Sequence, residues 1–519
     1  MIKMKKINLI RITSIVLCIM LIVGTIAGCN KKEETSKNDG NVTLKWVIGA
    51  NGKMKDCDRV FAEFNKQLQN YMPGTKVEFE VIAYSDFAEK WNLMSASREK
   101  VDLVWVGWML NLDEEVRKGS FREMDDLLQY APEMTAEIPS NIFDLCRVKG
   151  KLYAIPCYQM MTGLPYGYKV PKKLADEYGL DHAKIAELFA NDKRPTKESF
   201  KPFEEWLERL KADGKLGKGV SKKFLDSVMG QMKAEGPVQS KVAANAFVKT
   251  DNDELKVFDF INHENSMEYY ELVTEWFNKG YIRKDILSLT DITLDEGKED
   301  GYVLWADSCF KGASETDSKK YGMEVISTAL FDRFIVSHNR PSTNTAIAKT
   351  CENPEKAMEF LNLMNSTKGK DLFNLLVFGF EGEHYKKIDD TKIEWLLESQ
   401  PGTSSDMAYG FSAWALGNTF NAYTTQYEVD GWNDYILNEV NANAIVSPLA
   451  GFSLDRQPIK LELAQYDAIF NEYVYLDLGA TPNYKELIKE RNEKMKKAGS
   501  DKILKETQRQ IDEWKKTKK

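Results

Sequence analysis

Three apolar runs within Thr43–Val106 decide the fold class: Thr43–Ile48 (TLKWVI), Thr75–Ile82 (TKVEFEVI) and Val101–Val106 (VDLVWV). Short runs rich in branched and aromatic residues are typical of buried strands. Between them, Asp58–Tyr71 and Phe87–Ser97 carry apolar residues at helical spacing. This strand–helix alternation predicts an α/β fold with mostly parallel sheets, right-handed crossovers and helices on both faces.

The remaining chain continues the mixture of helices and strands. Arg147–Pro156 (RVKGKLYAIP) predicts a hairpin that turns at Lys149-Gly150, and Pro171–Lys284 is mainly helical in pattern. Further predicted elements are strands at Gly301–Ala306 and Tyr321–Ile326, a helix capped by Asn353-Pro354, and two charged amphipathic helices around Gly499.

Length and composition limit the classes of protein. The chain has 519 residues, of which 43% are hydrophobic and 29% charged, so it is a folded protein with more than one domain. A mean hydropathy of -0.44 excludes a membrane protein with many spans. The net charge of -8, without a long basic block before the extreme C-terminus, argues against nucleic acid as the partner.

The first residues have the pattern of an export signal. Lys3, Lys5, Lys6 and Arg11 precede an apolar stretch from Ile12 to Ala27, and Ile26-Ala27-Gly28-Cys29 resembles a bacterial lipobox. We therefore expect a signal peptide over residues 1–28, a lipidated Cys29 and a polar tether over residues 29–41. An ordinary signal peptide or a single N-terminal anchor helix is the alternative, although the apolar stretch is short for a membrane span.

Sequence motifs of catalysis and of metal or cofactor binding are missing. The chain has no G-x-S-x-G elbow, no phosphate-binding loop, no G-x-G-x-x-G and no H-E-x-x-H. The four histidines are isolated, and Cys57, Cys146, Cys157, Cys309 and Cys351 are odd in number and widely spaced, so we expect buried thiols and neither metal nor cofactor. Asp251–Glu254 is interpreted as a solvated acidic turn, and whether calcium braces a loop stays open.

Aromatic residues are the strongest hint of a ligand. Trp108, Tyr158, Trp305 and Trp414 stand at predicted strand ends or in glycine-containing loops, where packing inside a strand or helix does not explain them. Sugars present an apolar face and a rim of hydroxyl groups, so their sites combine flat aromatic rings with polar side chains. In open α/β sheets such ligands bind beyond the carboxyl ends of the strands.

Six segments in order resemble the extracellular solute-binding proteins of ABC importers, most of all the carbohydrate-binding lipoprotein branch. They are Asp102–Trp105 after the opening strands, Val148–Pro156 (VKGKLYAIP), Trp276–Asp285 (WFNKGYIRKD), Ala346–Leu363 (AIAKTCENPEKAMEFLNL), Gly379–Tyr385 (GFEGEHY) and Trp414–Phe420 (WALGNTF). Together they span nearly all of the chain that follows the predicted signal.

The resemblance implies a type II periplasmic-binding-protein-like fold of two α/β lobes with a cleft between them. The N-terminal lobe would comprise residues 42–157 plus 335–388, and the C-terminal lobe residues 158–334 plus 389–519. The implied protein is a monomer without enzymatic activity, anchored to the outer face of the cell membrane by its lipid alone. It would capture an oligosaccharide by hinge closure and deliver it to the permease subunits of an ABC transporter.

The resemblance also implies ligand contacts, which are Asn51, Trp108, Tyr158, Trp305, Asp307, Trp414 and Asn418. Glu381 and Tyr385 are interpreted instead as structural residues of a tight turn at Gly379 and Gly382. Two alternatives stay open: a surface lipoprotein enzyme, a hydrolase or lyase, with two carboxyl groups facing each other across a cleft, and a peptide-binding protein of the same fold with charged clamps.

Overall fold

The computed structural model describes residues 41–190, 194–234, 239–249, 254–289, 295–331 and 337–517. The predicted signal peptide, Cys29 and the tether up to residue 40 lie outside these residues, and so do three of the four residues of the acidic turn Asp251–Glu254. None of the described helices is both long and apolar enough to cross a membrane.

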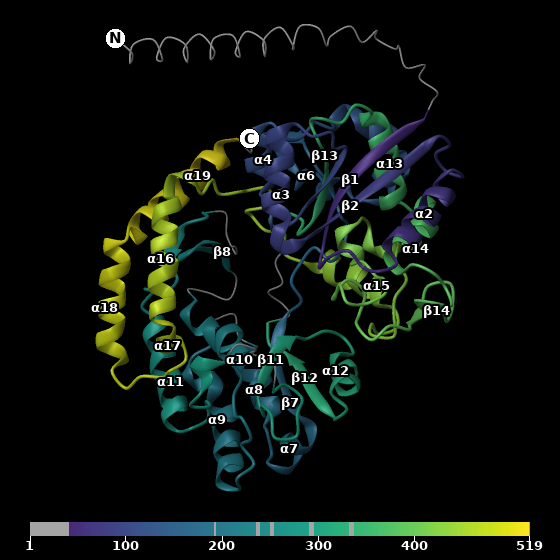
Figure 1. The fold of residues 1–519 in the computed structure, drawn as a ribbon. Helices are drawn as coiled ribbons and strands as arrows, with labels where there is room; N and C mark the ends of the chain where they lie inside the picture. The colour runs from purple at the N-terminus through teal and green to yellow at the C-terminus, as the bar shows by residue number, and fades with distance from the viewer. Residues whose placement is uncertain are drawn as a thin grey trace, which may run out of the picture.

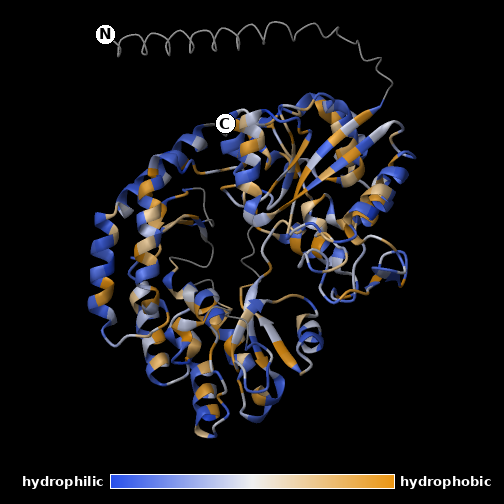
Figure 2. Ribbon diagram, in the orientation of Figure 1, coloured by the Kyte–Doolittle hydropathy of each residue, from blue (hydrophilic) through white to orange (hydrophobic). Residues whose placement is uncertain are grey.

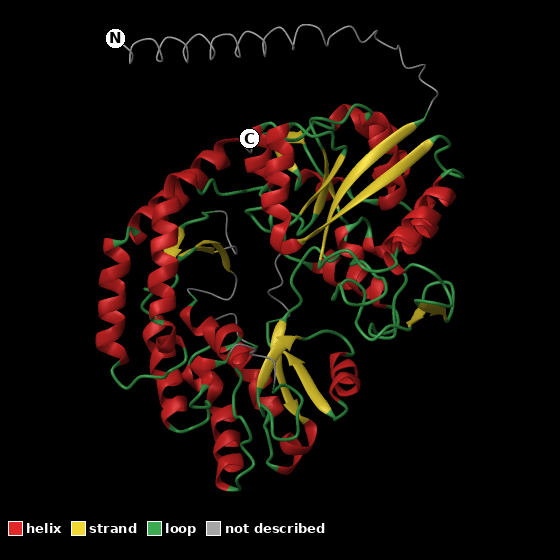
Figure 3. Ribbon diagram, in the orientation of Figure 1, coloured by secondary structure: helices red, strands yellow, loops and turns green. Residues whose placement is uncertain are grey.

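The first lobe is built on a five-stranded sheet of order β2-β1-β3-β13-β6 (Figures 1 and 3). β1 runs parallel to β2 and β3, whereas β13 is antiparallel to β3 and β6. Its main elements are β1 (Val42–Ala50), α2 (Cys57–Leu68), β2 (Thr75–Ala83), α3 (Tyr84–Ser97), β3 (Leu103–Val106), α4 (Leu112–Lys118), α5 (Pro132–Glu137), α6 (Ser140–Asp144), β6 (Ile155–Pro156), β13 (Asn344–Ile347), α13 (Pro354–Asn365) and α14 (Lys370–Phe378). The βαβαβ prediction is therefore confirmed.

The second lobe contains a three-stranded sheet of order β11-β7-β12. β7 is antiparallel to both neighbours, so the prediction of mostly parallel sheets is wrong for this lobe. The reason is that β11 and β12, which α12 connects, are parallel to each other, and the strand that enters from the first lobe lies between them in the opposite direction. Its main elements are β7 (Tyr166–Pro171), α7 (Lys172–Glu177), α8 (His182–Phe189), α9 (Lys197–Ala212), α10 (Lys222–Ser227), α11 (Ser266–Asn278), β11 (Trp305–Ser308), α12 (Ala313–Tyr321) and β12 (Val325–Ala329).

A C-terminal unit forms an arc along one side of both lobes (Figure 1). Its helices pack on a small sheet of order β10-β9-β8 and share an apolar cluster with it. Its elements are β8 (Gln239–Ala243), β9 (Ala246–Lys249), β10 (Val257–Asp259), α16 (Lys460–Glu472), α17 (Val474–Asp477), α18 (Tyr484–Lys497) and α19 (Ser500–Thr517). α18 and α19 are largely hydrophilic along their outer faces, as their charged sequences predict (Figure 2).

The core of the first lobe extends beyond the predicted boundary at residue 388. Trp395 and Tyr423 are buried in the cluster of the first sheet, although the sequence assigned them to the second lobe. The Phe411 amide donates to the Val377 carbonyl at 2.9 Å and so fixes this segment beside α14. Within residues 389–519, it is the later part, including Leu476, that packs against the second lobe.

Three chain segments meet where the lobes are joined. The segment after β6 bridges to the one before β13 through Thr162 and Ser337, and the His338 amide donates to the Met161 carbonyl at 2.8 Å. A third segment joins them because the Ser337 amide donates to the Ile445 carbonyl at 2.8 Å. The two lobes are thus joined through these three segments.

The five cysteines of the described residues are free and buried. The hairpin of β4 (Arg147–Val148) and β5 (Lys151–Leu152) turns at Lys149-Gly150 as predicted. The Tyr153 amide donates to the Cys146 carbonyl at 3.4 Å, so Cys146 lies opposite Tyr153 and is not paired with Cys157.

Candidate functional site

Three parallel strands of the first lobe deliver side chains to one edge of the sheet. Asn51 follows β1, Tyr84 follows β2 as the first residue of α3, and Trp108 lies just past β3. Together with residues 400–436 they line a cavity of about 720 Å³, which we call the aromatic pocket. Its principal lining residues are Asn51, Tyr84, Trp108, Phe411, Trp414, Phe420, Tyr427 and Trp432. The pocket lies at the carboxyl ends of the strands, where open α/β sheets bind ligands.

The centre of the aromatic pocket is a group of three rings. The Trp108 and Trp414 ring centroids are 5.4 Å apart with planes tilted by 46°, and Tyr84 lies 5.0 Å from Trp108. Trp105, which is fully buried, supports Trp108 from below in an edge-on contact at 5.2 Å. Trp108 is nevertheless 56% exposed, which is unusual for an indole and leaves its face free for a ligand.

Polar groups border these rings. The Asn51 side-chain amide donates to the Gly402 carbonyl at 2.7 Å and is exposed, so its oxygen is open to the cavity. Gln159 also lines the pocket. Burial raises the pKa of Tyr84 to about 12, so its hydroxyl is a neutral hydrogen-bonding group at physiological pH.

Two other predicted contacts have mainly structural positions in the first lobe. Tyr158 is 8% exposed, its ring packs edge-on against Phe420 at 5.1 Å, and its carbonyl accepts from the Thr419 amide at 2.8 Å. Asn418 is buried, and its side-chain oxygen accepts from the Phe420 amide at 3.1 Å. Both hold the Trp414–Phe420 turn in place, and neither lines the aromatic pocket.

The two predicted contacts of the second lobe do not join this pocket. Trp305 is fully buried and packs edge-on against Tyr321 at 5.8 Å, so its proposed role as a platform is wrong in this structure. Trp305 begins β11 and does not end it, and its side chain packs in a small apolar cluster with Tyr302, Val325 and Tyr321. Asp307 forms an ion pair with Lys223 at 3.1 Å. Burial alone would raise the pKa of Asp307, but the Ser308 amide and Lys223 lower it below its usual value.

Sequence reasoning missed several residues of the pocket. Tyr84 could have been predicted in the same way as Trp108, because each is an aromatic residue that lies two positions after a predicted strand. Tyr427 lies in an irregular segment and Trp432 begins the short helix α15 (Trp432–Tyr435). Both are far along the chain, and no local pattern connects them with the first sheet.

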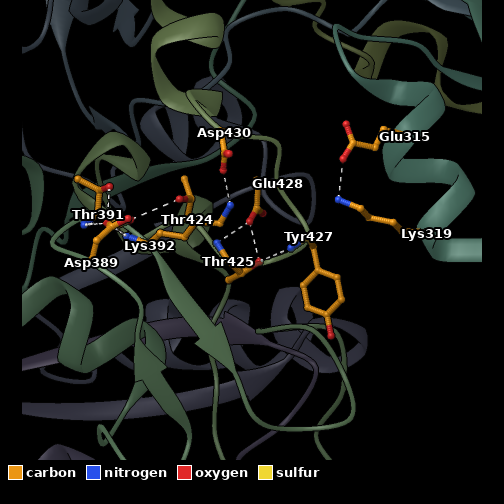
Figure 4. Close-up of polar contacts among 10 residues, drawn as sticks. All are labelled: Glu315, Lys319, Asp389, Thr391, Lys392, Thr424, Thr425, Tyr427, Glu428 and Asp430. Carbon is orange, nitrogen blue, oxygen red and sulfur yellow. Dashed lines mark hydrogen bonds and ion pairs between the residues drawn. The ribbon is translucent and has the colours of Figure 1, made fainter.

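A second cavity of about 1160 Å³, the polar pocket, lies beside the first. Gln400, Tyr427 and Glu428 line both cavities, so the two are contiguous. One wall is α12 of the second lobe and the other is segment 426–439, whose Leu437 packs on the first-lobe core. Figure 4 shows Glu315 and Lys319 of α12 on one side and the segment Thr424–Asp430 on the other.

One cluster has the composition of a metal site. One ligand atom from each of Asp56, Glu383 and His384 lies within 4.8 Å of the others. The Arg59 guanidinium, however, already donates to both Glu383 oxygens at 3.0–3.1 Å and is 3.4 Å from Asp56. His384 Nδ1 accepts from the Phe380 amide at 3.0 Å and Nε2 is 3.2 Å from Asp56. We therefore interpret the cluster as a structural network, in which the Arg59 guanidinium pairs with the carboxylates.

The neighbouring Gly379–Tyr385 segment forms the tight turn that its glycines predict. Gly382 has a φ of +83°, and its amide donates to the Tyr385 carbonyl at 2.7 Å. Tyr385 is buried, and the Glu381 backbone bridges to it. Both residues are therefore structural, at a distance from the lining of the two cavities.

Comparisons with known proteins agree with this architecture. A carbohydrate ABC transporter substrate-binding protein of Streptococcus pneumoniae serotype 4 (strain ATCC BAA-334 / TIGR4) is 24% identical, with 96% of this chain and 95% of that protein covered. The crystal structure of the N-glycan transport solute-binding protein NgtS from Streptococcus pneumoniae has a TM-score of 0.70 at 20% identity, covering 92% of this chain and all of that one. A solute-binding protein from Bifidobacterium longum subsp. infantis has a TM-score of 0.58 at 14% identity, with 92% and 99% covered.

Two family models match different parts of the chain. Residues 448–516, most of the C-terminal unit, match a domain of unknown function. Residues 58–371, more than half of the chain, match the bacterial extracellular solute-binding proteins. With its two joined α/β lobes and its pocket at the strand ends, the chain belongs to the family of bacterial extracellular solute-binding proteins.

Proposed function

We propose that this protein captures a carbohydrate, most suitably an oligosaccharide, outside the cytoplasm and delivers it to the permease of an ABC importer. The observation that carries the proposal is the exposed Trp108 indole beside Trp414 at the strand ends of the first lobe. Flat rings bordered by amide and hydroxyl groups suit the apolar face and hydroxyl rim of a sugar. A substrate-binding relative named for carbohydrate transport supports the same ligand class, as does a structural neighbour crystallised with Man1GlcNAc.

The mechanism follows from the joint between the lobes. A sugar on the aromatic pocket contacts the first lobe, and closure brings the second lobe onto it, so the ligand stabilises the closed form. Catalysis is not part of the proposal. The one carboxylate among the described lining residues of the aromatic pocket is Glu428, which accepts from the Thr425 amide at 2.7 Å and hydroxyl at 2.6 Å. Glycoside hydrolysis would need a facing pair of carboxyl groups beside the sugar, and three of the further carboxylates in the contiguous polar pocket are held in ion pairs with lysines.

Substitution of the two indoles tests the ligand site. We expect Trp108→Ala and Trp414→Ala each to weaken sugar binding by roughly 30-fold, or about 2 kcal/mol, because each removes an aromatic contact surface. A thermal-shift screen of sugars and peptides identifies the ligand, and isothermal titration calorimetry measures affinity. Trp305→Phe, a change of a buried indole outside the pocket, should leave affinity unchanged. Unaltered sugar affinity in both alanine variants would reject this site, and peptide binding or glycan turnover would reject the function.

We propose further that the chain acts as a monomeric lipoprotein, held at the membrane through lipidated Cys29. The support is the lipobox-like Ile26–Cys29 after a basic and apolar leader. A lipid tether raises the effective concentration of the protein near a permease. Cys29→Ala should remove the lipid mass from the N-terminal peptide of the protein, which mass spectrometry measures. A Cys18→Ala variant is the control, and a lipid mass that persists in Cys29→Ala would contradict the proposal.

A further inference from the structure

The polar pocket continues the aromatic pocket toward the second lobe. The two cavities share Gln400, Tyr427 and Glu428, so a ligand on Trp414 can extend from one into the other. The extension would contact α12 of the second lobe as well as segment 426–439, which packs with the first lobe. A ligand that fills both cavities would therefore join the lobes.

The two walls of the polar pocket already touch at one end. The Phe310 and Trp432 rings meet edge-on with centroids 5.1 Å apart, and Lys311 pairs with Glu439 at 3.4 Å. The segment before α12 and segment 426–439 are therefore in contact in this structure, and Trp432 also lines the aromatic pocket.

The charges of the polar pocket compensate one another. It is lined by four lysines and five carboxylates, a net charge of -1. Lys319 pairs with Glu315 at 2.8 Å and Lys392 pairs with Asp430 (Figure 4). Lys311 pairs with Glu439. Lys320 also lines the pocket, and its ammonium group lies 4.8 Å from the centre of the Tyr321 ring. An acidic ligand would face the net negative charge of the pocket, whereas a hydroxyl group donates to a carboxylate and accepts from an ammonium without breaking a pair.

We propose that the polar pocket is a second subsite, which holds the distal residues of an oligosaccharide and selects chains without charge. This inference rests on the proposed function, because the first residues of the chain would lie on the Trp108–Trp414 rings. The combined cavities would then give long neutral oligosaccharides a higher affinity than short or acidic ones.

A blocking variant separates the two subsites. Asn438 is exposed and lines the polar pocket alone, and Asn443 is exposed on the same helical segment and lines neither cavity. We expect Asn438→Trp to weaken binding of long chains by about tenfold or more and to leave short sugars within about twofold. Asn443→Trp should change neither. The probes are manno-, gluco- and xylo-oligosaccharide ladders of one to about seven residues, with oligogalacturonides as the acidic series, measured by calorimetry on the full chain.

The outcomes distinguish a failure of this inference from a failure of the proposed function. If no neutral or acidic ladder binds, the proposed carbohydrate function fails. If a ladder binds but Asn438→Trp matches Asn443→Trp at every length, the second subsite is rejected while the function stands. If oligogalacturonides bind more tightly than neutral chains of equal length, the selection for uncharged chains is rejected. Loss of affinity for long chains alone in Asn438→Trp supports the proposal.

Discussion

Asp56 joins segments of the chain that are 328 positions apart, through its contact with His384. Burial alone would raise the pKa of Asp56, but the hydrogen bond with His384 and the charge of Arg59 outweigh this effect and lower the pKa below its ordinary value. A carboxyl group whose pKa is lowered on folding stabilises the protein above its unfolded pKa, and this contribution is lost as the pH falls through the folded pKa.

Asp56→Asn should therefore lower the free energy of unfolding by about 1–2 kcal/mol near pH 7. The difference from wild type should begin to shrink below about pH 4, where the carboxyl group of the unfolded chain takes up a proton, and it should be lost below the lowered pKa of the folded protein. Urea unfolding between about pH 7 and pH 3 measures both quantities. Asp58→Asn on the same helix is the control, because Asp58 forms an exposed pair with Lys53 that is worth less than about 1 kcal/mol. A gap between wild type and Asp56→Asn that does not change with pH would contradict this account.

At the scale of an element, the end of β3 depends on Gly107. A Cβ atom at this position would lie 2.1 Å from the Trp105 ring, which is fully buried and supports Trp108. Gly107→Ala should therefore lower the free energy of unfolding by about 1–3 kcal/mol through overpacking, and it should weaken sugar binding by moving Trp108. Gly163→Ala is the control, because a Cβ there meets no atom within 4 Å. Equal melting temperatures and equal affinities in the two variants would contradict this role of Gly107.

The same scale shows why some elements could be predicted and others could not. β3 (LVWV) is a continuous buried apolar run, and β1 (VTLKWVIGA) is buried from Trp46 to Ala50, so these strands of the first lobe could be predicted from the sequence. β7 (YGYKVP) contains Lys169, which is buried because it pairs with Asp317 at 2.7 Å. No local sequence pattern indicates that partner. β8, β9 and β10 are short and are stabilised by α19, about 250 positions later; the Gln508 side chain, for example, accepts from the Val257 amide.

The residues of the candidate site also divide into those that the sequence predicts and those that it does not. Trp108 follows a strand whose end at Val106 is predicted correctly, and Asn51 follows β1, which ends at Ala50, two residues beyond its predicted end. The structure brings both side chains to the aromatic pocket with Trp414. Trp305 was misplaced because the predicted strand ended at residue 306, whereas β11 begins at Trp305 and ends at Ser308. The polar pocket depends on how two distant segments meet, which composition and periodicity do not encode.

At the scale of the whole molecule, a buried charge network fixes the C-terminal unit to the second lobe. Lys233 pairs with Asp477 away from solvent, and the Tyr269 hydroxyl donates to the Asp477 carbonyl at 2.7 Å. Arg491 donates to the Tyr270 hydroxyl at 2.8 Å. Burial would lower the pKa of Lys233, but the charge of Asp477 raises it above its ordinary value. The unit therefore belongs with the second lobe when the lobes move.

Asp477→Asn should lower the free energy of unfolding by about 3–5 kcal/mol, because it leaves the Lys233 ammonium buried without its counter-charge. The double variant Lys233→Met with Asp477→Leu should lose much less, since it removes both charges. Arg117→Ala breaks only an exposed pair with Asp455 and should cost less than about 1 kcal/mol. Thermal and urea unfolding of the four proteins test this, and a double variant as unstable as Asp477→Asn would contradict a charge-pairing origin.

The buried thiols have a consequence for the life of the protein after export. Burial raises the pKa of Cys57 to about 11 and that of Cys157 and Cys309 to about 12, and it raises the pKa of Cys146 and Cys351 as well. The reactive thiolate is then scarce, and oxidants outside the cell find no accessible sulfur among these five side chains. Maturation outside the cytoplasm thus requires no disulfide-forming catalyst for these residues, and oxidising surroundings leave these five thiols unaltered.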